Sequence, residues 1–135
     1  MKKSAWEAVT RSVAASPYPV TVLEPSSQAP ALVAELGIAA DSWLGAVVLH
    51  TGGLVVDGRL RVFGSGSAEL PAVHVEDGRM LVAEHVRGDR YALAVTGKGR
   101  LAVHQLEPGL PEWESLNLGY ANWLGAMIAG SLDEC

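Results

Sequence analysis

Apolar residues near the N-terminus recur at the spacing of a helix. Trp6, Val9 and Val13 fall on one stripe when residues are placed 3.6 to a turn. Ser4 and Glu7 stand in the S-x-x-E arrangement, in which each side chain satisfies a backbone N–H group of the first turn. The pattern predicts an N-terminal helix that ends before residue 17, a proline.

Two further helices are predicted, one shortly after the first and one at the other end of the chain. The first covers about 29–36, with Gly37 as a residue that can end it in a left-handed conformation. The second begins near Gly119. Its apolar stripe, spaced i, i+3, i+4, i+7 and i+8, consists of Tyr120, Trp123, Leu124, Met127 and Ile128.

Between these helices the pattern changes to runs rich in β-branched residues. The proline-flanked segment 17–23 is extended and suits an edge strand. Asp57-Gly58 marks a two-residue hairpin, and short glycine-containing turns join the later runs as antiparallel neighbours. The segment 64–78 has room for a short strand at about 73–75. The remaining strand-like runs are 44–56, 78–86, 89–95 and 100–106.

These elements predict a single α+β domain over residues 1–135. An antiparallel β-meander of about five or six strands is covered by N-terminal helices and a C-terminal helix. A chain of 135 residues with 49% hydrophobic and 19% charged residues can bury a core without metals or disulfides. No apolar run reaches the roughly 18 residues of a membrane span, and the N-terminus lacks the apolar core of a signal peptide. We therefore expect a cytoplasmic protein that does not enter a membrane.

The charge is distributed unevenly. All ten lysines and arginines lie within residues 1–100, so the last 35 residues account for the net charge of −5. A net negative charge without a basic cluster argues against nucleic-acid binding. In the acidic segment, Trp113 has two interpretations: an anchor that fixes the last helix to the sheet, or a binding hot spot. The residues predicted to bind a protein partner are Glu107, Glu112, Trp113 and Glu114.

Catalytic and metal-binding patterns are absent from the sequence. His50, His74, His85 and His104 match no short metal-ligand motif, although separate strands could bring three of them together. Cys135 is the last residue, where no base can be held beside it. No catalytic residue, metal or cofactor is therefore predicted.

Glycine-rich and carboxylate patterns also have simpler interpretations. The segments 64–67, 87–89 and 97–99 are interpreted as turns and not as phosphate or adhesion motifs, and the terminal pair Asp133-Glu134 as solvated carboxylates.

Several motifs together resemble a bacterial family of unknown function. They are 50–54 (HTGGL), 59–66 (RLRVFGSG), 81–86, 91–93, Leu110, 112–114 (EWE), Leu116, 119–120 and 123–124. The ending, a strand followed by Glu-Trp and a helix with aromatic residues and leucine, is similar to the wider SUKH superfamily. That resemblance implies an immunity protein that binds and neutralises a polymorphic toxin.

The sequence thus favours a non-enzymatic protein-binding domain whose partner is a basic toxin domain, because acidic side chains attract a basic protein. The alternative is a small-molecule or metal-binding protein, or an enzyme, with a pocket between sheet and helices that uses His50, His85 or His104. A homodimer formed through an exposed sheet face is a third interpretation.

Overall fold

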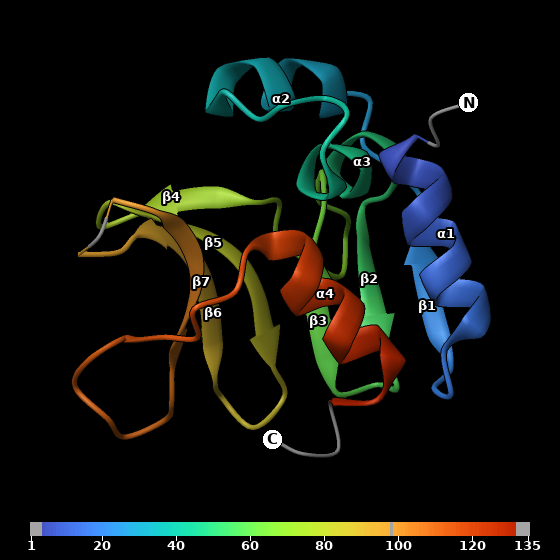
Figure 1. Ribbon diagram of the computed structural model, residues 1–135. Coiled ribbons are helices and arrows are strands. Elements are labelled where there is room, and N and C mark those ends of the chain that lie inside the picture. Colours follow the sequence, from blue (N-terminus) through green and yellow to red (C-terminus); the bar gives the residue numbers. More distant parts are fainter. Residues whose placement is uncertain (1–3, 98, 132–135) are drawn as a thin grey trace.

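An antiparallel sheet of eight strands and four helices form the fold, seen in a computed structural model that describes residues 4–97 and 99–131 (Figure 1). The helices are α1 (Ala5–Ala15), α2 (Ala29–Leu36), α3 (Trp43–His50) and α4 (Tyr120–Ala129). The strands are β1 (Val20–Leu23), β2 (Gly53–Val56), β3 (Leu60–Phe63), β4 (His74–Glu76), β5 (Arg79–His85), β6 (Arg90–Val95), β7 (Leu101–Leu106) and β8 (Glu114–Ser115). The predicted α+β class with helices at both ends is confirmed.

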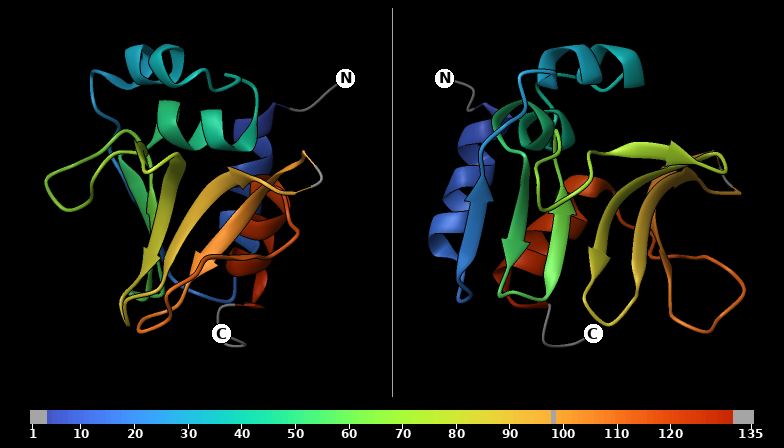
Figure 2. Two further views of the ribbon diagram at one scale, coloured as in Figure 1. Left: turned by 90° about the vertical axis from the view of Figure 1, so that its left-hand side faces the viewer. Right: turned by 180° about the vertical axis from the view of Figure 1, so that it is seen from behind.

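The strands follow the chain closely, in the order β1-β2-β3-β5-β6-β7-β8. Strand β5 is shared: its second half pairs with β3, and its first half pairs with β4. The sheet curves, and α1 and α4 lie on the same face while α2 and α3 lie across one end of the strands (Figure 2). The sheet has eight strands where five or six were predicted; β1 lies at one edge, as expected for the segment 17–23, and the two-residue strand β8, which was not predicted, lies at the other.

Local signals explain three of the helices. The Ser4 hydroxyl accepts a hydrogen bond from the Glu7 backbone N–H at 3.1 Å and caps α1 as predicted. Gly37 ends α2 with φ +68°, a conformation that favours glycine. The predicted apolar stripe of α4 is buried at all five positions.

The prediction of strand structure throughout 44–56 was wrong, because residues 43–50 form α3. The Ser42 hydroxyl accepts a hydrogen bond from the Gly45 backbone N–H at 3.0 Å and caps the helix. Five consecutive residues of α3 are buried, so the helix has no polar face that would reveal a 3.6-residue period. A short apolar run of this kind cannot be assigned to helix or strand from periodicity alone.

The two glycine motifs, 52–53 and 64–66, meet where the chain leaves α3 and β3. A Cβ atom on Gly64 would lie 2.5 Å from the Thr51 carbonyl oxygen and 2.8 Å from the Gly53 nitrogen. A Cβ atom on Gly52 would lie 2.3 Å from the Glu24 carbonyl oxygen. Backbone segments pass too closely here for any side chain, so the glycines are required by packing. Nothing in this crossing resembles a phosphate-binding loop, and the turn interpretation of 64–67 fits it.

One hydrophobic core joins α1, α3 and α4 to the sheet. No helix in the described ranges is long and apolar enough to cross a bilayer. The predictions made for Asp133, Glu134 and Cys135 lie outside the described residues.

Candidate functional site

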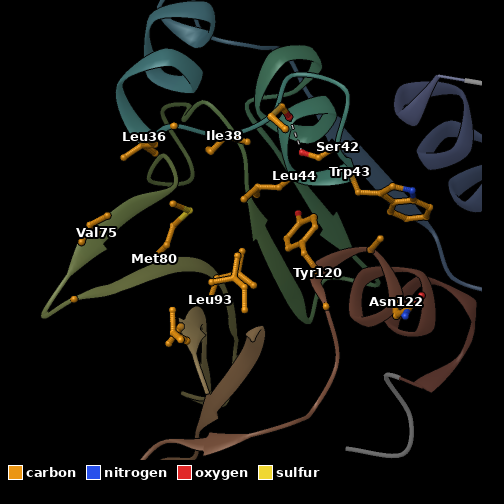
Figure 3. A pocket seen from close by; sticks show the side chains of 18 residues that line it. Leu36, Ile38, Ser42, Trp43, Leu44, Val75, Met80, Leu93, Tyr120 and Asn122 are labelled. Carbon is orange, nitrogen blue, oxygen red and sulfur yellow. Dashed lines mark hydrogen bonds between the residues drawn. The ribbon is translucent and has the colours of Figure 1, made fainter. Parts of the chain in front are cut away.

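An apolar cleft of about 650 Å³ lies between the helical end of the molecule and the tips of two hairpins (Figure 3). Its walls come from the α2–α3 connection, the β4–β5 hairpin, the β6–β7 hairpin and the start of α4. Its larger apolar lining residues are Leu36, Ile38, Trp43, Leu44, Val75, Met80, Leu93, Val95, Leu101 and Tyr120. We call this site the apolar cleft.

The helical wall is fixed by a tight connection between α2 and α3. After Gly37, the chain passes directly over α3, where a Cβ atom on Gly45 would lie 2.1 Å from the Ala39 carbonyl oxygen. The Ser42 hydroxyl donates to that same carbonyl oxygen at 2.6 Å while it caps α3. This close packing places Ile38 beside the cleft, and the single proton of the Ser42 hydroxyl is already donated to the Ala39 carbonyl oxygen and not to a base.

The opposite wall consists of strand pairs that carry apolar residues to the opening. Met80 pairs with Leu93 across β5 and β6, and Val95 pairs with Leu101 across β6 and β7. Val75, Val95 and Leu101 remain 57%, 67% and 61% exposed at the rim. A single exposed aliphatic residue is ordinary, but three around one apolar opening are typical of a binding site.

Tyr120 places a polar group in these apolar surroundings. Its side chain rises from the first residue of α4 toward Leu44, and its hydroxyl is buried without a hydrogen-bond partner among the described residues (Figure 3). Burial raises the pKa of the Tyr120 hydroxyl, so the group stays neutral and keeps its proton. The ring packs against Trp123 at 5.8 Å between centroids, which holds it in place.

The described residues that line the cleft have no charged side chain. Among its 18 lining residues there is no aspartate, glutamate, histidine, lysine or arginine. None of these described residues therefore offers the cleft a carboxylate, imidazole or amine as a general base. Its arrangement suits binding of a neutral, largely apolar molecule.

The residues predicted to bind a protein lie elsewhere, on the long loop between β7 and β8 and on β8. Glu107, Glu112 and Glu114 are exposed, and Trp113 is half-buried against the core. The Arg79 guanidinium lies over the Trp113 ring, 5.2 Å from its centroid. Trp113 thus packs inward as the anchor interpretation requires and keeps some exposed surface.

The histidines do not line the cleft. A pocket lies between sheet and helices, as the alternative interpretation expected, but His50 stacks on Trp6 and His85 is the last residue of β5. The His104 ring nitrogen Nδ1 lies 3.1 Å from the Ala102 carbonyl oxygen. Within the described residues, no three histidine, cysteine, aspartate or glutamate side chains are placed to hold a metal ion.

A buried polar cluster occupies the turn between β5 and β6. Asp89 is fully buried and accepts hydrogen bonds from the Arg87 Nε at 2.5 Å and the Gln105 amide at 2.7 Å. Burial raises the pKa of Asp89, but these hydrogen bonds outweigh it and hold that pKa below its usual value. The Arg87-Gly88-Asp89 tripeptide is a turn, as predicted, and its carboxylate points inward.

Sequence reasoning allowed for a pocket between sheet and helices but missed the residues that line the cleft, because its walls come from four separate segments. The available signal was weak: Val75, Val95 and Leu101 sit beside hairpin turns, where polar residues are more common. Tyr120 was correctly placed in the buried stripe of α4, but its unpartnered hydroxyl could not be deduced from that position.

Comparison with known proteins gives a family and one curated relative. A family model described as "Protein of unknown function DUF2625" matches residues 1–135. YbfG, an uncharacterized protein of Escherichia coli (strain K12), is 32% identical in a match that covers 73% of this chain and 51% of YbfG. The chain therefore spans about half the length of this curated relative. No solved structure matches the chain. Neither description mentions SUKH, so that resemblance stays a prediction.

Proposed function

This chain belongs to the DUF2625 family of unknown function, and we propose that it binds a small apolar ligand in the apolar cleft without converting it chemically. The cleft carries this proposal, since it is concave, about 650 Å³ in volume and lined mainly by aliphatic and aromatic side chains. Small-molecule sites commonly enclose about 300–1,000 Å³ and have mostly hydrophobic walls with a few polar groups.

The composition of the cleft supports binding over catalysis. Acid–base or nucleophilic chemistry needs a titratable or activated group within hydrogen-bond reach of the substrate. The Ser42 hydroxyl donates to the Ala39 carbonyl oxygen and accepts a hydrogen bond from the Gly45 N–H. Burial raises the pKa of the Tyr120 hydroxyl and keeps it protonated. Binding is the activity that this set of residues can perform unaided.

Titration with propylbenzene, followed by amide chemical shifts in NMR, tests the proposal. We expect saturable shifts confined to the cleft walls. Val95→Asp places a charge at the rim and should weaken binding, because an apolar ligand would then bury a carboxylate. Val86→Asp is the matched control, since Val86 is also exposed but lies outside the cleft. Equal binding by both variants, or no saturable shifts, would overturn the proposal.

A second candidate function is the one that the sequence favoured: binding of a basic protein partner, in the manner of a SUKH-like immunity protein that neutralises a toxin. The supporting observation is the loop between β7 and β8, which extends away from the helices (Figure 1). It carries exposed Glu107 and Glu112, with exposed Glu114 on β8 and Leu110 53% exposed. An acidic surface around an apolar residue would attract a basic partner.

Co-expression with the product of the adjacent open reading frame tests this candidate through protection from toxicity. Replacing Glu107, Glu112 and Glu114 together by lysine should abolish protection, because the attraction becomes repulsion. A control with the same change in charge replaces exposed acidic residues away from this loop, namely Glu24, Glu35 and Glu69. Absence of protection by the unmodified protein, or equal protection by both triple variants, would exclude this site.

A further inference from the structure

The buried hydroxyl of Tyr120 is a donor without an acceptor in the apolar cleft. The side chain is only 7% exposed, and no described residue forms a hydrogen bond with its oxygen. A buried polar group left unpaired is costly, and native proteins usually pair such groups. We propose that the ligand of the apolar cleft is a neutral molecule with a carbonyl oxygen that accepts a hydrogen bond from Tyr120. This inference rests on the proposed function.

The absence of charge in the cleft argues for a neutral ligand. A buried carboxylate or ammonium group needs an opposite charge or several hydrogen bonds, because removing it from water is expensive. The lining residues offer no charged side chain. Fatty acids and amines would therefore have to leave their head groups in solvent, out of reach of a buried hydroxyl.

The start of α4 favours an acceptor over a donor. Gly119 caps this helix without a side-chain hydrogen bond, and 119–122 all line the cleft. The first N–H groups of a helix are donors, and their end of the helix carries a partial positive charge. The helix start and the Tyr120 hydroxyl thus both suit a ligand oxygen that accepts hydrogen bonds, such as that of a ketone, an ester or an amide.

The geometry around Tyr120 keeps its hydroxyl in position. Trp123 packs on Tyr120 at 5.8 Å and on Tyr91 at 5.2 Å between ring centroids. Trp123 is fully buried, so the Tyr120 ring has a rigid support. The Tyr120 oxygen has almost no exposed surface, so a ligand oxygen would reach this donor by displacing the side chains that cover it, while the apolar parts of the ligand contact the aliphatic walls.

Two probes of nearly identical shape test the assignment: propiophenone and propylbenzene, which differ only in a carbonyl group in place of a methylene. Each is titrated by NMR into the unmodified protein and into Tyr120→Phe, which removes only the hydroxyl. We expect propiophenone to bind the variant roughly two- to tenfold more weakly, the range for one lost neutral hydrogen bond. Propylbenzene should bind both proteins equally or bind the variant more tightly. Hydrocinnamate, a carboxylate of similar size, should bind more weakly than propiophenone.

The outcomes separate this inference from the proposed function. If both probes bind and Tyr120→Phe changes them by the same factor, the carbonyl assignment is overturned while the cleft remains a ligand site. If hydrocinnamate binds more tightly than propiophenone, the ligand is not neutral and the assignment also fails. If neither probe binds either protein, both proposals fail. The melting temperature of Tyr120→Phe should equal or exceed that of the unmodified protein, since the hydroxyl has no partner to lose.

Discussion

The carbonyl oxygen of Thr51 accepts two hydrogen bonds from Ser65, one from its backbone N–H and one from its hydroxyl, both at 2.9 Å. This pair joins the end of α3 to the turn after β3. The Ser65 hydroxyl also accepts a hydrogen bond from the Ser26 backbone N–H at 2.8 Å, so the chain before α2 is fixed at the same point. The two glycine motifs that support the family resemblance therefore have a structural role.

Gly64→Ala should strongly destabilise the protein. Its Cβ atom would lie within 2.8 Å of three atoms of Thr51 and Gly53, so the crossing would have to open. We expect a loss of about 1–3 kcal/mol or more in the free energy of unfolding, the usual cost of overpacking, measured by urea denaturation. Gly97→Ala is the control, because nothing lies within 4 Å of a Cβ atom there. Equal stability of the two variants would show that the crossing adjusts freely.

The helices and strands that the sequence predicted correctly are those whose signals are local. The Ser4–Glu7 cap, Gly37 after α2 and the stripe of α4 each depend on residues within a few positions of one another. The helix α3 was missed because burial on all sides removes its polar face. The residues that decide its state include Gly45, whose role appears only when the chain at Ala39 lies against it.

The candidate site was less accessible to sequence reasoning because it depends on contacts between distant segments. Composition directed attention to Glu112, Trp113 and Glu114, where polar and aromatic residues adjoin in the chain. The cleft instead combines ordinary aliphatic residues from four segments, and its distinctive group is one atom of Tyr120. Nothing local to Tyr120 distinguishes a hydroxyl with a partner from one without.

The two tryptophans near the C-terminus should differ in their contribution to stability. Trp123 is fully buried, so Trp123→Ala should cost about 3–5 kcal/mol. Trp113 is half-buried beneath the Arg79 guanidinium, so Trp113→Ala should cost less, roughly 1–3 kcal/mol. Urea denaturation of both variants checks the order. A Trp113→Ala variant as unstable as Trp123→Ala would make Trp113 a core residue, and one with unchanged stability would remove its role as an anchor.

The stacked rings of Trp6 and His50 should contribute a small amount to the free energy of unfolding, and this contribution should require both rings. The rings lie 4.5 Å apart between centroids at 12° and connect α1 to α3. Aromatic pairs contribute about 0.5–1.5 kcal/mol, and the exposure of His50 favours the lower end. A double-mutant cycle with Trp6→Leu and His50→Ala should give a coupling of roughly 0.5 kcal/mol. The same cycle with Thr10→Ala in place of Trp6→Leu should give none, and equal couplings would argue against the stack.

His85 should make the stability of the protein depend on pH in the mildly acidic range. Burial lowers the pKa of His85 below its ordinary 6.5, and the nearby Arg87 guanidinium lowers it further, although Asp89 opposes the shift. Its neutral Nδ1 accepts a hydrogen bond from the Arg87 backbone N–H at 3.2 Å, which protonation would abolish. Because the unfolded chain takes up the proton first, stability should fall as the pH drops below about 6.5 and level off below the folded pKa.

Urea denaturation between pH 8 and pH 5 measures this effect against two variants. His85→Asn keeps an acceptor near the Arg87 N–H but cannot titrate, so its stability should change less over this range. Val86→Asn, an exposed change beside His85 that removes no titratable group, should retain the slope of the unmodified protein. Asp89 does not interfere, because its pKa lies below the ordinary 3.8 and its contribution is lost only in stronger acid. A slope unchanged in His85→Asn would show that another group controls the response, and a rise in stability on acidification would contradict the direction of the His85 pKa shift.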